Sequence, residues 1–200
     1  LRMVEGEEIT VCDMQKNVYV CKISGFSADE VYLDVVEQTA SDTEPVCYIK
    51  LYQAIPKSDK LETIIQKSTE CGVSEIIPFA SERCIAKIEG KDIQKKAERH
   101  NKIAESAAKQ SGRGIIPKVR EAMKYNEALN DAADCDLMIF CYEGDNTCSL
   151  KEILRENKNA KTIYGYLPYN QEVRTVPMLE QALRDGKRVA VPKCYGDEMK

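Results

Sequence analysis

The sequence predicts an α/β protein in which a small antiparallel β-barrel precedes a parallel α/β domain. Apolar residues recur at every second position between residues 9 and 35, which is typical of half-buried strands. From residue 46 onward, continuous apolar runs alternate with helical patterns, the order that produces a parallel sheet with right-handed crossovers. The 200 residues, 43% of them hydrophobic and 31% charged, suffice for one sizeable core or two small ones and exclude disordered and collagen-like classes.

Three short strands are predicted in residues 1–44. The alternation that predicts them is carried by Ile9, Val11, Val18, Val20, Val31, Leu33 and Val35. Polar turn material at residues 13–17 and 24–29 separates the three strands. These residues are therefore predicted to form the barrel, which we expect to lack its first strand.

A second domain is predicted to begin at Pro45, because proline cannot donate a hydrogen bond in a central strand. Residues 46–52 then read as a buried parallel strand. Ser58 is placed to cap a helix that Gly72 ends in a left-handed conformation, and residues 74–79 read as the next strand.

Further along, the longest helix is predicted over residues 91–111, with small alanines on its packed side and a stop at Gly112. The remaining predicted elements are helices at 126–133, 149–156 and 176–184 and strands at 137–142, 162–166 and 188–192. We read this order as a doubly wound sheet.

Charge and cysteines limit the possible functions. The net charge of −4 argues against a wholesale electrostatic grip on nucleic acid, yet nine basic residues fall between positions 91 and 120. They form either a phosphate-contacting face or a solvated helix face.

The nine cysteines contain no C-x-x-C pair and there is one histidine, His100, so we expect reduced cysteines, no structural zinc and a structural role for His100.

Residues 1–4 lack a signal-peptide layout, and no apolar run approaches the roughly 20 residues of a membrane span, so a cytoplasmic protein is expected.

Three motifs in order resemble one family. They are "SDKLETIIQKSTECGV" at 58–73, "PFASERC" at 78–84 and "AESAAKQSGR" at 104–113. Over residues 1–162 the chain resembles the methyltransferases, of the SPOUT class, that methylate N3 of a uridine in 16S ribosomal RNA. The resemblance implies a PUA-like RNA-binding barrel at 1–44, the first part of a SPOUT-type domain at 45–162, S-adenosylmethionine as cofactor, 16S rRNA of the small ribosomal subunit as partner, and a homodimer.

Gln110 and Arg113 are the first candidate catalytic residues. They lie one helical turn apart at a predicted helix end, so both side chains can reach one space. Arg113 suits a phosphate or a uracil carbonyl and Gln110 suits a base edge, whereas a C-terminal arginine can also simply offset the helix dipole. The match of "KQSGR" to the family favours the functional interpretation.

The resemblance marks further residues. It implies RNA contacts for Lys67, Glu70, Arg83 and Lys109, and a catalytic role for Glu143, which follows a strand in "LMIFCYE". Lys67 and Glu70 can equally form an exposed ion pair at i, i+3 spacing, and Glu143 can equally cap a turn.

The last segment differs from this family. Its Gly-Pro-Glu-Gly-Gly loop and Leu-Arg-x-Glu-Thr-Ala segment, which form the donor-binding knot, do not occur, so we expect impaired donor binding. Residues 163–200 resemble the amino-terminal half of 5-formyltetrahydrofolate cyclo-ligase, which implies that Tyr164, Tyr166 and Glu172 face a folate. That family's nucleotide-binding residues for ATP do not occur either. A cyclo-ligase fragment and a non-catalytic RNA-binding protein are therefore the alternative hypotheses.

Overall fold

The structure, a computed structural model, describes residues 3–57, 60–81, 92–140 and 149–166 and the short segments 189–190, 194–195 and 198–199. It divides into two compact units. The first unit contains Leu1–Glu44 and Ala108–Ile116, and the second contains Pro45–Ala107 and Pro117–Lys200.

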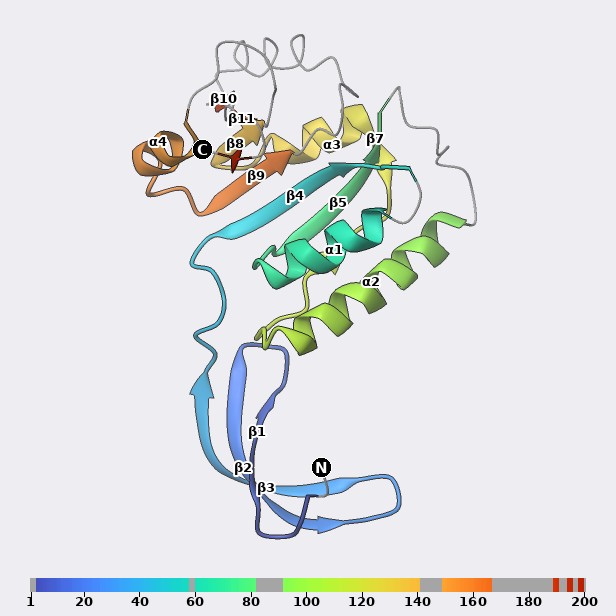
Figure 1. The fold of residues 1–200 in the computed structure, drawn as a ribbon, viewed down its shortest axis with the longest axis vertical. Coiled ribbons are helices and arrows are strands. Elements are labelled where there is room, and N and C mark those ends of the chain that lie inside the picture. The colour runs from blue at the N-terminus through green and yellow to red at the C-terminus, as the bar shows by residue number, and fades with distance from the viewer. Residues whose placement is uncertain are drawn as a thin grey trace. The chain divides into compact units, whose positions relative to one another are not determined.

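The first unit is built on an antiparallel sheet in the order β1 (Glu8–Cys12), β2 (Asn17–Phe26) and β3 (Val31–Ala40), shown in Figure 1. The three predicted strands are confirmed. The turn predicted at residues 24–29 is wrong at its start, because β2 continues to Phe26 by pairing Gly25 with Tyr32 and Phe26 with Val31. In the part of this unit that the structure describes, the strands form one sheet with β1 and β3 at its edges, and closure into a barrel stays a prediction.

The second unit is built on a parallel sheet in the order β10-β8-β9-β4-β5-β6, and β7 also pairs with β5. The strands are β4 (Tyr48–Ala54), β5 (Glu75–Ala80), β6 (Lys118–Val119), β7 (Met123–Lys124), β8 (Leu137–Phe140), β9 (Thr162–Tyr166) and β10 (Val189–Ala190). A separate antiparallel pair joins β11 (Cys194–Tyr195) to β12 (Glu198–Met199). The predicted parallel sheet is confirmed.

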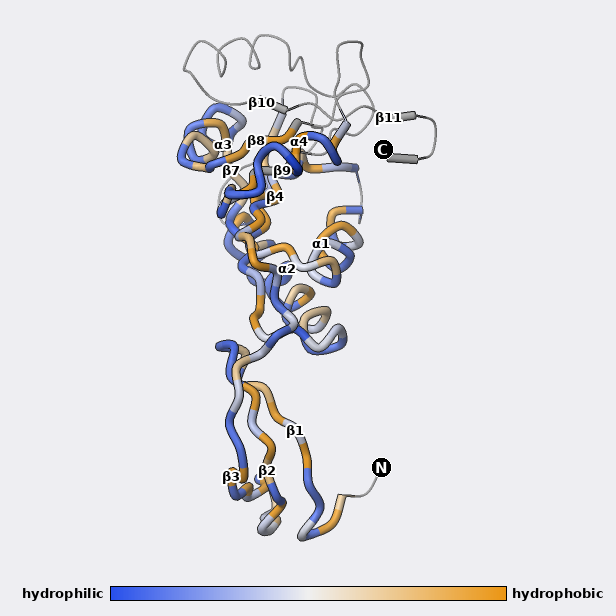
Figure 2. The backbone as a smooth tube through the Cα atoms, turned by 90° about the vertical axis from the view of Figure 1, so that its left-hand side faces the viewer, coloured by the Kyte–Doolittle hydropathy of each residue, from blue (hydrophilic) through white to orange (hydrophobic). Residues whose placement is uncertain are grey.

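Helices cover both faces of this sheet. Successive residues of each strand point to opposite sides, so apolar strand residues need packing partners on both faces. Leu51 of β4 packs with Ile65 of α1 (Lys60–Glu70) and Ala104 of α2 (Asp92–Gln110). Its neighbour Tyr52 packs on the other face with Ala128 of α3. Helices α3 (Tyr125–Ala132) and α4 (Leu150–Glu156) complete the layers, and Figure 2 shows the tube of α3 alternating between hydrophilic and hydrophobic positions. The doubly wound arrangement is confirmed.

Two glycines end helices as predicted. Gly72 has φ +98° and Gly112 has φ +69°, both in the left-handed region that glycine adopts without a Cβ penalty. A Cβ at Gly72 would lie 2.7 Å from the Cγ of Pro45, so close packing also requires glycine there. The cap predicted at Ser58 and the helix predicted at 176–184 lie outside the described residues.

Asn101 takes the place of a further strand beside β6. Its amide nitrogen donates to the carbonyl of Val119 at 2.7 Å and its amide oxygen accepts from the N–H of the same residue at 3.0 Å. The amide nitrogen also donates to Ala97 within α2. An edge strand presents unpaired backbone groups, and here one side chain satisfies both groups of Val119.

We expect Asn101→Ala to lower the free energy of unfolding by about 2 kcal/mol, because it leaves two backbone groups of β6 without partners in a partly buried position. Urea denaturation followed by circular dichroism measures this. Asn130→Ala, at an exposed position of α3, controls for helix propensity and should change stability by less than about 0.5 kcal/mol. Equal effects of the two substitutions would contradict this role for Asn101.

Candidate functional site

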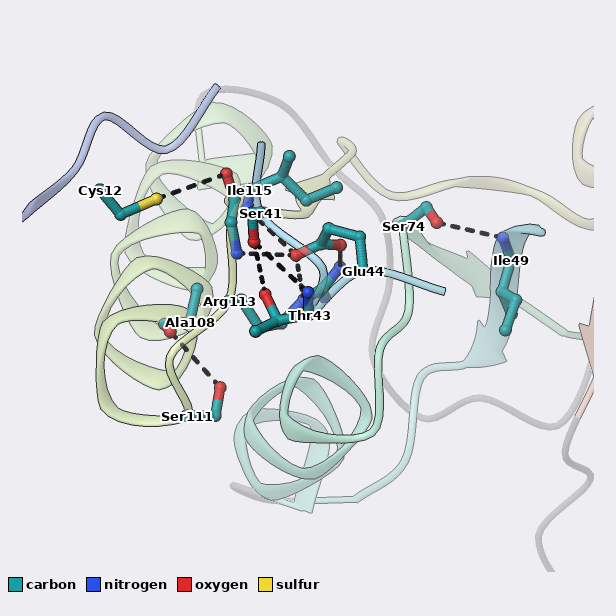
Figure 3. A network of polar contacts seen from close by, with 11 residues as sticks. Cys12, Ser41, Thr43, Glu44, Ile49, Ser74, Ala108, Ser111, Arg113 and Ile115 are labelled. Atoms are coloured by element: carbon teal, nitrogen blue, oxygen red, sulfur yellow. Dashed lines mark hydrogen bonds and ion pairs between the residues drawn. The ribbon is translucent and has the colours of Figure 1, made fainter. Parts of the chain in front are cut away.

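The turn that follows α2 is held by one buried carboxylate in the first unit. Glu44 Oε1 accepts from the N–H of Gly114 at 2.8 Å and of Ile115 at 3.2 Å, and from Arg113 Nε at 3.3 Å. Glu44 Oε2 accepts from Arg113 Nη2 at 2.5 Å. The side chains of Arg113 and Glu44 are only 4% and 8% exposed, so this ion pair is shielded from water (Figure 3).

The surroundings of Glu44 favour its charged form. Burial by itself would raise the pKa of this carboxyl group, but the hydrogen bonds and charge of Arg113 together with the two backbone N–H groups outweigh burial. The pKa of Glu44 therefore lies below its ordinary value, and the ion pair persists at neutral pH.

The β1–β2 turn packs on the same segment. The N–H of Lys16 donates to the carbonyl of Gly114 at 2.9 Å, and the N–H of Ser41 donates to the carbonyl of Lys16 at 2.8 Å. Met14 and Lys16 adopt left-handed φ angles of 59° and 71°, which are uncommon for residues with side chains. Three parts of the chain that are remote in sequence thus meet around Gly114.

Gly114 leaves no space for a side chain. A Cβ at this position would lie 2.5 Å from Ser41 Oγ and 2.7 Å from Ser41 Cβ. The close approach allows the backbone of the turn to reach both Glu44 and Lys16. Glycine is required here for packing, whereas Gly112, two residues earlier, is required for its positive φ.

The candidate site residues around this turn differ in burial. Arg113 is buried and bound to Glu44, whereas Lys109 and Gln110 lie exposed in the last turn of α2. Sequence reasoning did not single out Glu44 as a functional residue, because its partner Arg113 lies 69 positions away.

Lys67 and Glu70 form an ion pair of 2.8 Å at the exposed end of α1. Hydrogen bonds from Lys67 and Gln66 lower the pKa of Glu70. This geometry is the exposed ion pair named above as the alternative, and an RNA contact for either residue stays a prediction. Arg83, Glu143 and Glu172 lie outside the described residues. Tyr164 and Tyr166 belong to β9, where their backbones pair with Lys50 and Tyr52 of β4.

A second polar cluster, which sequence reasoning missed, fixes α3 to the sheet. Asp131 of α3 accepts from Arg120 Nη1 at 2.8 Å and from the hydroxyl of Tyr52, and Lys50 lies 3.7 Å away. Burial would raise the pKa of Asp131, but the bonds from Tyr52 and Arg120 and the nearby positive charges lower it overall. Because this carboxylate serves α3 packing, we interpret it as structural.

The nine clustered basic residues do not all lie on one exposed face, and a phosphate-contacting role for the exposed ones stays a prediction. Arg113 and Arg120 bind carboxylates inside their units, and Lys91 lies outside the described residues. Six are exposed, namely Lys95, Lys96, Arg99, Lys102, Lys109 and Lys118, and one of these, Arg99, pairs with Glu62 at 2.7 Å. His100 is half-buried, and burial lowers its pKa, which agrees with a structural role.

The sheet has a topological switch point between β4 and β9. From β4 the chain proceeds outward to β5 and β6, whereas β8 and β9 lie on the other side of β4. Open α/β sheets bind ligands at the carboxyl ends of the strands at such a point. Two buried polar side chains lie near this edge, Gln53 in β4 and Ser81 directly after β5.

Two negative findings apply to the described residues alone. None of their helices is long and apolar enough to cross a membrane, and no group of three or more His, Cys, Asp or Glu side chains among them is placed to hold a metal ion.

This fold defines the class of the molecule as a doubly wound α/β protein whose parallel sheet has a topological switch point. Residues 42–166 match the model of the RNA methyltransferase domain family, and the chain belongs to that family.

Individual relatives agree with the family match. The chain is 36% identical over 143 residues to the ribosomal RNA small subunit methyltransferase E of Bacillus subtilis, a match that covers 72% of this chain and 56% of the relative. It is 31% identical over 133 residues to the protein of the same name from Mesomycoplasma hyopneumoniae, covering 66% and 57%. The chain thus spans a little over half the length of these relatives.

Solved structures show the same fold. The ribosomal RNA small subunit methyltransferase E of Neisseria gonorrhoeae, crystallised with S-adenosyl methionine, superposes with a TM-score of 0.69 at 25% identity and covers 98% of this chain and 78% of that one. A crystal structure described as a hypothetical protein superposes with a TM-score of 0.80 at 28% identity, covering 95% and 76%.

Replacing Glu44 by Gln should lower the free energy of unfolding by about 3 kcal/mol at neutral pH, because it leaves the Arg113 cation buried without a charged partner. Since the folded pKa of Glu44 is lowered, its contribution is complete above the ordinary pKa of 4.5 and is lost as the pH falls through the folded value. Urea denaturation should therefore show the difference between wild type and variant shrinking in acid. Asp42→Asn, at the exposed neighbouring carboxylate, is the control and should cost less than about 0.5 kcal/mol.

Adding a methyl group at Gly114 should cost about 2 kcal/mol of stability through the clash with Ser41. Ser41→Gly should recover most of that loss when combined with Gly114→Ala. Gly112→Ala, where φ is positive but space is open, should cost about 1 kcal/mol, and Ser41→Gly should not recover it. A double-mutant cycle by thermal denaturation measures the coupling, and additive effects of Gly114→Ala and Ser41→Gly would argue against the clash.

Proposed function

We propose that this protein is an S-adenosylmethionine-dependent methyltransferase that acts on RNA of the small ribosomal subunit, at N3 of a uridine. The observation that carries the proposal is the family match over residues 42–166, supported by the 36% identity to the Bacillus subtilis enzyme. The 16S rRNA is accordingly the proposed partner. A PUA-like first unit, a homodimer and a cytoplasmic location belong to the same proposal.

The methyl donor is proposed to bind at the carboxyl edge of the parallel sheet. S-adenosylmethionine is the ligand of the Neisseria gonorrhoeae relative, and the switch point between β4 and β9 supports this edge. The buried polar groups described there are the amide of Gln53 and the hydroxyl of Ser81. The amide nitrogen of Gln53 already donates to the carbonyl of Ala54 at 3.0 Å, and we assign no step of the transfer to either group.

Gln110, at the end of α2, is proposed to hold the uridine. Because α2 runs from the carboxyl end of β5 back toward the start of β6, Gln110 lies about 27 Å along the helix from the end nearest the donor edge, so the proposed homodimer would have to bring Gln110 of one protomer to the donor of the other. Methylation at N3 requires the base to be extruded and held while N3 loses its proton, and an amide such as Gln110 can bond to the base edge. Arg113, with its guanidinium held by Glu44, would stabilise this end of the helix, and Glu143 is the third proposed catalytic residue. Lys67, Glu70, Arg83 and Lys109 are the proposed RNA contacts.

The folate alternative is not favoured. The match to the RNA methyltransferase family continues through Tyr164 and Tyr166, and the relatives reported above are methyltransferases rather than cyclo-ligases. The parallel pairing of β9 with β4 and β8 also makes these two tyrosines part of the sheet that the family match covers.

The proposal predicts that the purified chain transfers a labelled methyl group from S-adenosylmethionine to unmodified small-subunit RNA, giving 3-methyluridine by mass spectrometry. Gln110→Ala should reduce the rate by at least about tenfold, because the lost hydrogen bond acts on the base during the reaction. Ser106→Ala, at another exposed position of α2, is the matched control and should leave the rate unchanged.

Calorimetric titration with S-adenosylmethionine gives the second readout. Donor binding without methyl transfer would restrict the chain to a binding function, and binding of RNA without donor would favour the non-catalytic alternative. Heat on titration with 5-formyltetrahydrofolate and ATP, in place of the donor, would overturn the proposal.

A further inference from the structure

The second unit contains a groove of about 910 Å³ at the edge of its parallel sheet. It lies between α2 and residues 118–123, which contain β6 and the start of β7, and Glu127 of α3 also lines it. We call it the β6–β7 groove. None of the described residues that line it belongs to the methyltransferase site proposed above, and its volume lies in the range of ligand sites.

A proline in β5 explains why the edge of the sheet is irregular at this groove. The carbonyl of Ile76 accepts from the N–H of Arg120 at 2.9 Å, so Ile76 directs its backbone groups toward the edge. Residues two positions apart in a strand direct their backbone groups the same way, and Pro78 therefore also faces the edge. Because proline has no N–H to donate, the hydrogen-bond ladder is interrupted there.

The register of the strands shows the same interruption. Ile76 lies beside Val119, whereas Phe79 lies beside Met123, so residues 120–122 take up the space that two residues of β5 span. One extra residue on one strand is the feature that makes a β-bulge, which bends the strand locally. We attribute the recess beside α2 to this bend.

Side chains satisfy the edge on either side of the bulge. Asn101 of α2 bonds to both backbone groups of Val119, as described above, and Glu127 accepts from the N–H of Lys124 at 2.9 Å. A ligand strand would find these backbone groups already occupied. Recognition in the groove must therefore rely on its side chains rather than on strand addition.

One end of the β6–β7 groove is basic. The helix α2 runs from the carboxyl end of β5 back toward the start of β6, and its Asn101 lies beside Val119. Lys102 follows Asn101 in α2 and Lys118 precedes Val119 in β6. Both lysines line the groove, and both lie toward the start of β6.

The other end of the groove is acidic. Glu98 lies one helical turn before Lys102, and Glu121 and Glu127 lie beyond β6 along the chain. In the part of the chain that the structure describes, these three carboxylates and the two lysines of the basic end take part in no ion pair. The groove therefore presents unpaired charges of opposite sign at its two ends.

The middle of the groove is apolar, and its length fits a short extended chain. Its apolar lining residues are Ala97, Val119, Ala122 and Met123. Along α2 the groove extends from Gln94 to Lys102, about 12 Å at the helical rise per residue. An extended peptide advances about 3.3 Å per residue and directs every second side chain to one side, so side chains at i, i+2 and i+4 span this length.

We propose that the β6–β7 groove binds an extended segment of a partner protein with the pattern Lys/Arg-x-apolar-x-Asp/Glu. The basic side chain of the segment meets Glu121 and Glu127. Its carboxylate meets Lys102 and Lys118, and its apolar side chain lies between them on the apolar lining. Charge complementarity at both ends selects this occupant, whereas the carboxylates of the groove repel a phosphate chain. The proposal goes beyond the methyl transfer proposed above and does not depend on it.

The first test addresses the basic end with the peptide Gly-Lys-Ser-Val-Ser-Glu-Gly, labelled at its amino end with an uncharged fluorophore and amidated at its carboxyl end. Fluorescence anisotropy on the full chain should show saturable binding. Replacing the glutamate of the peptide by glutamine should weaken binding about fourfold, as expected for an exposed charge pair. The double variant K102M/K118M should bind both peptides equally, whereas Lys151→Met, at an exposed position of α4 outside the groove, should retain the difference.

The second test addresses the acidic end. Replacing the lysine of the peptide by glutamine should also weaken binding to the wild type about fourfold. Glu121→Gln should reduce this difference, and Glu152→Gln, at an exposed position of α4 outside the groove, should leave it unchanged. A variant that merely unfolds would lose binding of every peptide, so the ratio between peptides isolates the charge pairs.

The outcomes separate this inference from the proposed function. Failure of the wild type to bind the peptide, or a charge preference that survives K102M/K118M and Glu121→Gln, overturns the proposal. Displacement of the peptide by an equal concentration of ten-uridine RNA would make the groove a phosphate site and would overturn it as well. Absence of methyl transfer counts against the proposed function alone, because the peptide titrations contain neither donor nor RNA.

Discussion

The carboxylate of Glu44 is the constraint on which the first unit depends. It satisfies two backbone N–H groups of the turn after α2 and neutralises Arg113, the only basic side chain that is buried among the described residues of this unit. Removing one partner of such a pair leaves an uncompensated charge away from water, which is far more costly than losing an exposed ion pair. This contact fixes the turn after α2, to which the β1–β2 loop bonds at Gly114.

The sequence was most informative where a pattern is local. The alternation in residues 9–35 predicted strands, because successive side chains of a strand point to opposite faces. The continuous apolar runs at 46–52 and 137–142 predicted strands that are buried on both faces. Glycines at 72 and 112 predicted helix ends because glycine adopts the left-handed conformation without a Cβ penalty. The turn predicted at 24–29 starts too early, because Ser and Gly favour turns locally whereas pairing with β3 extended the strand to Phe26.

The chemistry of the site was less accessible, because its contacts join distant positions. Arg113 was identified as a candidate but its partner Glu44 was not, and the contacts of Asp131 with Tyr52 and Arg120 had no sequence signal at all. In the sequence, Glu44 before Pro45 indicates only a domain boundary, and an acidic residue in a short helix, such as Asp131, is expected to face solvent. Only the fold shows which of the clustered basic residues remain exposed and which are bound to carboxylates.

The first unit is discontinuous in the chain, and this has a consequence for the order of folding during synthesis. Its strands end at Ala40, but the residues that neutralise and bond to Glu44 occur at 113–115, after a strand, two helices and another strand of the second unit. While the chain is made from its amino end, Glu44 remains without those partners until about 70 more residues have emerged. The contacts that fix the turns of the sheet β1-β2-β3 therefore form only after much of the second unit has been synthesised, and a fragment ending at Glu44 would lack them.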